Sequence, residues 1–220
     1  MKLRLLVSFA LLGLVCLINP AALRANTVSI CDGISGNIVV NCGFESGVVG
    51  SAPLLWTANA GFLLHVGTFN QVVASPGLVN SGNNALQFGN FDSEPPAGIS
   101  QLLTDTSGQS YTVNFFMFDG GASSQDASAF FDAQINGTNK VALTGVTAPA
   151  TYTDFTFSFT GTGSDTLAFL ADTTPREFYL DDVSVVANAA VVTPEPASIV
   201  LLGSGLAGLW FKRRHLHQKA

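Results

Sequence analysis

The central part of the sequence, residues 26–190, predicts an all-β domain folded as an antiparallel β-sandwich. Short apolar or alternating segments recur along it, and clusters of Gly, Asn, Asp and Ser separate them. No stretch of helical length shows the apolar period of an amphipathic helix. Many short strands at this spacing are typical of two packed antiparallel sheets.

The clearest predicted strand covers residues 152–160, in which Phe155, Phe157 and Phe159 alternate with polar residues. This alternation is the pattern of a strand with one buried face. Residues 110–118 end in consecutive apolar residues, which indicates a central strand. The other strands are expected at residues 38–41, 62–66, 84–89, 99–103, 129–135, 140–143, 166–171 and 178–186.

The N-terminus has the composition of a cleavable secretory signal peptide. Lys2 and Arg4 precede an apolar run over residues 5–18, and small residues follow it. We expect a signal helix over residues 1–25, with signal peptidase cutting after Ala25 or, as the alternative, after Ala22.

The C-terminal region, residues 191–220, has three parts in a fixed order. A proline-flanked triplet comes first, then an apolar run over residues 197–211, then a basic tail over residues 212–220. A helix over the apolar run spans roughly 22 Å, less than the ~30 Å hydrocarbon core of a bilayer. Trp210 and snorkelling basic side chains compensate for the difference, so a single transmembrane helix is expected. Its length alone also fits a buried core helix.

The positive-inside rule places the basic cluster in the cytoplasm and the β domain in the periplasm. The triplet consists of Pro194, Glu195 and Pro196, and the basic cluster of Lys212, Arg213 and Arg214.

This order of features resembles the PEP-CTERM sorting signal of exported proteins in Gram-negative bacteria that make extracellular polysaccharide. The resemblance implies processing by exosortase, a membrane-embedded cysteine protease, with Pro194, Glu195 and Pro196 as its recognition triplet. Prolines keep such a segment extended, and an extended strip is what a protease engages.

Charge is distributed unevenly between the ends and the centre of the chain. The central domain carries only Lys140 and Arg176 against fourteen acidic residues from Asp32 to Asp182, a net charge of 2 − 14 = −12. Such a surface repels phosphate backbones, which excludes nucleic acid as a partner. It suits divalent cations or neutral partners such as glycans.

Two segments resemble the first and last strands of galactose-binding-like jelly rolls, a group that includes many carbohydrate-binding modules. The first is residues 37–45, with Trp56 shortly after, and the second is residues 178–185. In the family the first segment often reads Asn-Gly-Gly-Phe-Glu, and here Cys42 replaces the first of its glycines.

The resemblance also implies a structural calcium ion between Glu45 and Asp181, with Asp182 as the alternative and backbone carbonyls near Gly43 completing the shell. Alternation places Asp181 on the inward face of its strand with Val183 and Val185, where a carboxylate needs a partner. The opposing expectation is that these acids are solvated at strand ends.

The other chemistry-bearing residues favour structural roles. Cys16 leaves with the signal peptide, so Cys31 and Cys42 remain as an even pair in an oxidising compartment and predict a disulfide. His65 is expected to face outward from a strand, and no nucleophile elbow accompanies it. Trp56 is expected in the core.

Taken together, the sequence predicts a non-enzymatic exported protein that begins as a membrane-anchored precursor facing the periplasm. Sorting would take it to the cell surface or extracellular matrix, where its role is structural or associated with exopolysaccharide. One alternative is a lectin-like protein with a defined sugar site. A less favoured one is a secreted glycan hydrolase that uses paired carboxylates.

Overall fold

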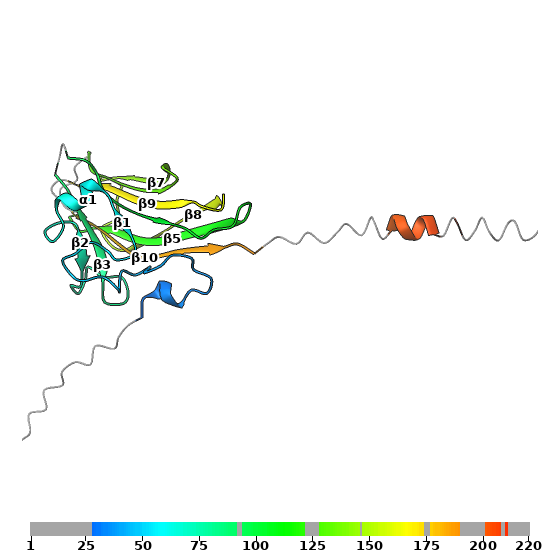
Figure 1. Cartoon of the computed structure of the whole chain (residues 1–220), viewed down its shortest axis with the longest axis horizontal. Coiled ribbons are helices and arrows are strands. Elements are labelled where there is room, and N and C mark those ends of the chain that lie inside the picture. Colours follow the sequence, from blue (N-terminus) through cyan, green and yellow to red (C-terminus); the bar gives the residue numbers. More distant parts are fainter. Residues whose placement is uncertain are drawn as a thin grey trace, which may run out of the picture.

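The computed structural model describes residues 28–91, 94–121, 128–145, 147–173, 177–189, 201–207 and 210. Ten strands form two five-stranded sheets that pack as a sandwich (Figure 1). The expected signal peptide, the proline-flanked triplet and the basic cluster at Lys212 to Arg214 lie outside the described residues. The all-β prediction for the central domain is confirmed.

Every strand pair within the two sheets is antiparallel. The first sheet has the order β1 (Thr57–Ala58), β4 (Ala97–Leu102), β9 (Thr166–Asp172), β6 (Phe130–Ile135) and β7 (Thr138–Thr144). The second has the order β2 (Gln71–Val73), β3 (Ala85–Gly89), β10 (Glu177–Ala187), β5 (Ser110–Asp119) and β8 (Thr153–Thr160). The last strand of the domain, β10, therefore lies in the centre of its sheet.

Phenylalanine fills the space between the sheets. The largest fully buried side chains include seven of them: Phe44, Phe62, Phe88, Phe115, Phe131, Phe169 and Phe178. Many of these rings meet edge to face, which is the arrangement that their quadrupoles favour. Trp56 is buried among them, 5.8 Å from the ring of Phe44, so its predicted place in the core is confirmed.

The two most strongly patterned strands appear where the sequence predicts them. In β8 the three phenylalanines are more buried than the polar residues between them. β5 lies between β10 and β8, as expected of a central strand. Its outward Phe118 is buried because Tyr179 stacks on it at 4.8 Å and Tyr152 meets it at 4.6 Å. Tyr152 also donates a hydrogen bond to the carbonyl of Leu78, which holds the loop around Leu78 over this face of the sheet.

Two expected strands are wrong. Residues 38–41 form no strand, because the chain turns there and Asn41 and Phe44 take left-handed backbone conformations, with φ of 52° and 59°. Residues 62–66 overlap a short helix, α1 (Ala60–Leu64), which begins where the Asn59 side chain accepts from the Phe62 backbone N–H at 2.8 Å. A short apolar run in a sequence fits a strand and a buried helix equally well. Here the Asn59 cap favours the helix.

The C-terminal helix prediction falls largely outside the described residues. Residues 201–207 are helical, within the apolar run expected to span a membrane. No helix among the described residues is long and apolar enough to cross a bilayer.

Candidate functional site

The central strand β10 carries a bulge at its two neighbouring aspartates. Asp181 pairs with Phe116 of β5, but Ser184 pairs with Asn114, so three steps on β10 face two on β5. The extra residue is accommodated by Asp182, whose φ is 51°. As a result the two side chains do not simply alternate across the sheet, and both are buried, at 0% and 2% exposed.

Backbone N–H groups surround the Asp181 carboxylate. Asn80, Ser81 and Asp182 donate to it at 2.9, 3.2 and 2.8 Å. Burial and the charge of Asp182 nevertheless raise the pKa of Asp181 to about 8, against the opposing effect of these three donors. Near neutral pH and without a cation, this carboxyl group therefore retains its proton.

Side-chain donors surround the Asp182 carboxylate. The Ser29 and Ser81 hydroxyls donate to it at 3.0 and 2.7 Å, and the Asn80 amide donates at 2.8 Å. All of these donors are neutral. Between residues that the structure describes, the one ion pair is His65–Glu94, which does not involve either aspartate.

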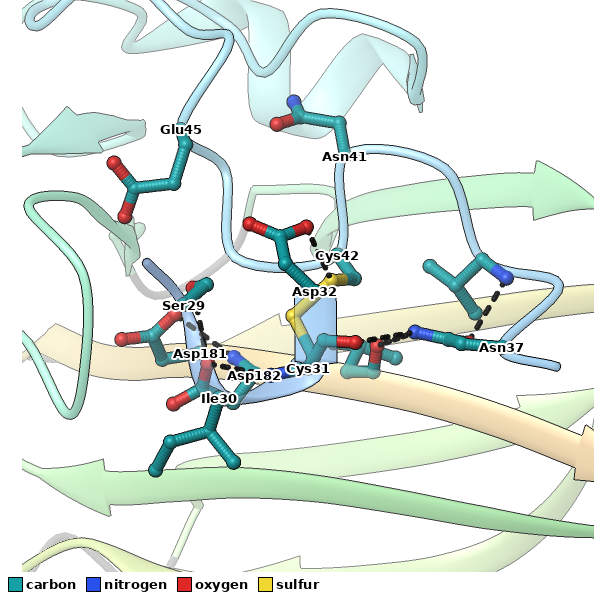
Figure 2. The surroundings of a disulfide bond; sticks show 12 residues. Ser29, Ile30, Cys31, Asp32, Asn37, Asn41, Cys42, Glu45, Asp181 and Asp182 are labelled. Atoms are coloured by element: carbon teal, nitrogen blue, oxygen red, sulfur yellow. Dashed lines mark hydrogen bonds between the residues drawn. A yellow bond between two sulfur atoms is a disulfide. The ribbon is translucent and has the colours of Figure 1, made fainter. Parts of the chain in front are cut away.

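Glu45 lies apart from the two aspartates, beside the loop that contacts them (Figure 2). Its Oε1 accepts from the backbone N–H groups of Asn83 and Asn84 at 2.7 and 3.1 Å. A Cβ on Gly82 would lie 2.0 Å from this oxygen and 3.2 Å from Ser29 Oγ. The residues 80–84 thus bridge Glu45 on one side and the aspartate pair on the other.

Gly43 provides space. A Cβ there would lie 1.7 Å from Ser29 Oγ, so only glycine lets Ser29 reach Asp182. Ser29, Asn80 and Ser81 are not singled out by the sequence. Their involvement depends on loops brought together across more than a hundred residues of chain.

The predicted disulfide between Cys31 and Cys42 is confirmed, with the two Cα atoms 6.0 Å apart. It fastens the helical turn η1 (Ile30–Gly33) to the segment before Glu45, which holds Ser29 over Asp182 (Figure 2). Among the described residues, Cys31, Asp32 and Cys42 form the one acid or thiol trio whose ligand atoms lie within 4.8 Å of one another. Because both sulfurs are in the disulfide, this trio offers no thiolate to a metal.

The donor chemistry of the aspartate pair fits a hard cation. Two adjacent buried carboxylates repel each other, and neutral donors do not cancel their charge. A proton on Asp181 removes one charge, and a bound cation would offset both. Oxygen ligands of this kind are those that calcium prefers.

The comparisons with known proteins concern the C-terminal region and the fold of the domain. Residues 192–214 match the PEP-CTERM protein-sorting motif. The chain carries a PEP-CTERM sorting signal. The motif begins five positions after Ala187, the last residue of β10. No curated protein matches the chain as a relative.

Solved structures share the sandwich of this chain at low sequence identity. TmCBM61 in complex with β-1,4-galactotriose is 18% identical with a TM-score of 0.52, and the match covers 70% of this chain and 100% of that one. A cyclase from Fischerella sp. TAU is 16% identical with a TM-score of 0.51, over 70% and 98% of the two chains. These likenesses establish that the chain shares a β-sandwich fold with both proteins. The same frame carries binding in one protein and catalysis in another.

Stability of the domain in the presence of a chelator should fall as pH rises from about 5 to about 9. The pKa of Asp181 lies near 8 in the folded protein and near 3.9 in the unfolded chain. Between these values the folded state holds the extra proton, so raising the pH favours unfolding. Thermal melts across this range measure the slope.

Asp181→Asn should flatten that slope, whereas Asp154→Asn, at an exposed position of β8, should leave it unchanged. A wild-type melting temperature that is constant from pH 5 to pH 9 would show that Asp181 is ionised throughout.

Proposed function

We propose that this protein is exported, sorted by an exosortase and delivered to the cell surface or extracellular matrix, where its sandwich has a structural or exopolysaccharide-associated role. The observation that carries this proposal is the sorting motif at residues 192–214. It follows a complete β domain after a short connection, because β10 ends at Ala187. The chain is thus one folded domain followed in sequence by a sorting motif.

The route begins with signal peptidase at residues 1–25 and leaves a precursor held by residues 197–211. In this proposal the β domain faces the periplasm and Lys212, Arg213 and Arg214 stay in the cytoplasm. Exosortase then acts at Pro194, Glu195 and Pro196. The membrane segment serves as a temporary anchor that processing removes.

Association with a neutral polysaccharide agrees with the charge of the domain. A net charge of −12 over residues 32–182 disfavours anionic partners and leaves uncharged glycans as compatible ones. The fold is also the one found in TmCBM61, whose complex contains β-1,4-galactotriose.

A catalytic role for the carboxylate pair is disfavoured by its burial. Asp181 and Asp182 are closed to solvent, so a glycan chain does not reach them. The imidazole of His65 is hydrogen-bonded to Glu94 at 2.8 Å, not to a serine or a cysteine. We therefore propose a binding or structural protein and not a glycan hydrolase.

We further propose that a structural calcium ion neutralises the aspartate pair. Asp181 and Asp182 would hold it, whereas Glu45, which accepts from the Asn83 and Asn84 N–H groups, would hold the 80–84 loop in place and not bind the ion. The ion would supply positive charge where the protein places two carboxylates and only neutral donors.

Replacing Glu195 by Gln should leave the precursor uncut and in the membrane fraction. The substitution removes the charge of the recognition triplet and keeps its size, so an exosortase that reads this charge would not process it. Fractionation and intact-mass measurement of the protein detect the change. Glu94→Gln, far from the motif in sequence, is the matched control and should be processed normally. Full-length Glu195→Gln protein in the medium would contradict sorting by this signal.

Removing calcium should lower the melting temperature. At free calcium about 100-fold above its Kd, linkage contributes about 2.7 kcal/mol, which corresponds to roughly 5–10 °C for a domain of this size. Melts in calcium and in excess chelator measure the difference. Asp181→Asn should abolish the response and Asp154→Asn should retain it. Equal melting temperatures in both conditions would remove the calcium proposal.

The protein should be retained by neutral polysaccharide in an affinity gel. Suitable probes are β-1,4-galactan, a neutral β-glucan and the neutral exopolysaccharide of the producing cells, with a gel lacking polysaccharide as the control. Unchanged mobility in all of them would contradict the polysaccharide association and leave the sorting proposal to its own test.

A further inference from the structure

A partly exposed aromatic cluster lies at one end of the sandwich, away from the aspartate pair. It consists of His65, Phe69 and Phe91, whose ring centroids lie 5.1 to 5.8 Å apart in edge-to-face contacts. Phe91 is 48% exposed, which leaves part of its ring open to solvent. We call these three rings, together with Glu94, the aromatic platform.

A carboxylate fastens the platform's rings to one another. Glu94 Oε2 accepts from the Phe91 backbone N–H at 3.2 Å and lies 2.8 Å from His65 Nε2. The Glu94 N–H in turn donates to the Phe91 carbonyl at 3.2 Å, so two hydrogen bonds join these residues. Hydrogen bonding to His65 lowers the pKa of Glu94, so the carboxylate is ionised at neutral pH.

Buried groups below the platform hold its parts in place. The Asn70 amide is fully buried, donates to the carbonyl of Phe62 at 3.1 Å and accepts from the Gly89 N–H at 2.8 Å. A Cβ on Gly89 would lie 2.7 Å from the Cβ of Phe69, so glycine is needed for this approach. The carbonyl of His65 accepts from three successive N–H groups, at residues 68–70. The platform is therefore preorganised, which reduces the entropy lost on binding.

The platform and the C-terminal end of β10 lie at opposite ends of the sandwich. Gly89, two residues before Phe91, pairs with Glu177 at the start of β10. The chain leaves β10 at Ala187 toward the motif, roughly 33 Å further along the strand. Figure 1 shows α1, which precedes His65, at one end of the sandwich and the exit of β10 at the other. A domain tethered through its C-terminus thus presents the platform outward.

The chemistry of the platform selects its occupant. It offers the exposed part of the Phe91 ring, and close to this ring are two residues with a further polar atom each, His65 Nδ1 and Glu94 Oε1, for which the described residues supply no hydrogen-bond partner. The three rings fill the space between themselves, so they form no cage around an ammonium group. The carboxylate and the acidity of the domain disfavour an anion. A pyranose ring has an apolar face and a rim of hydroxyl groups, which match the ring and the two polar atoms.

We propose that the aromatic platform is a binding site for a neutral sugar unit of an extracellular polysaccharide, stacked on Phe91 and hydrogen-bonded by His65 and Glu94. The inference rests on the proposed polysaccharide association and adds the site to it. Leu63 and Leu64, the last two residues of α1 and the two before His65, are also exposed.

Affinity gels with the same polysaccharides test the site, using protein purified from the producing cells in mild detergent. Phe91→Ala should weaken retention about tenfold, because it removes the stacking face. Phe91→Tyr keeps the ring and should keep retention. Leu102→Ala, at an exposed apolar position on β4, is the matched control and should behave as wild type. Phe91→Ala also loses its contacts with His65 and Phe69, so every variant is first shown to melt well above the temperature of the gel.

The outcomes separate the site from the function. Retention of wild type and Phe91→Ala to the same extent would overturn the platform and leave the polysaccharide association standing. No retention of wild type by any polysaccharide would overturn both. Phe91-dependent binding to poly-L-lysine without retention by polysaccharide would assign the platform to a cationic partner and overturn the sugar.

Discussion

The organisation of this domain depends on two carboxylates buried side by side on its central strand. A bulge in β10 turns both Asp181 and Asp182 away from solvent. No basic side chain among the described residues forms an ion pair with either of them. Their oxygens are instead satisfied by loops. Asn80 and Ser81 contact both, and Ser29 joins from the start of the domain. An unpaired buried carboxylate is costly, so these loops are drawn onto the strand.

Several local features follow from this constraint. Gly43 leaves room for Ser29, and the disulfide between Cys31 and Cys42 holds the N-terminal segment where Ser29 reaches Asp182. Tyr152 donates to the Leu78 carbonyl, and its burial together with the nearby aspartates raises the pKa of its hydroxyl. The bulge thus links the first residues of the domain, the 80–84 loop and the last strand into one unit.

Prediction succeeded where a pattern is local and strong. The alternation in residues 152–160 identifies β8, and the consecutive apolar residues in 110–118 identify the central β5. It failed at residues 62–66, where a short apolar run forms a helix because Asn59 caps it. It also failed at 38–41, where left-handed residues turn the chain. β1 and β2, of two and three residues, are too short to carry a pattern.

The sequence by itself determined the sorting motif, the all-β class, the disulfide and the acidity of the domain. Each of these depends on composition or on residues close together in the sequence. Only the tertiary structure decided that Asp182 is buried beside Asp181 and that Glu45 lies apart from them. It alone brought Phe91, Phe69 and His65 into one partly exposed cluster. Those arrangements depend on strand register and on loops that meet across the fold, and no local pattern encodes them.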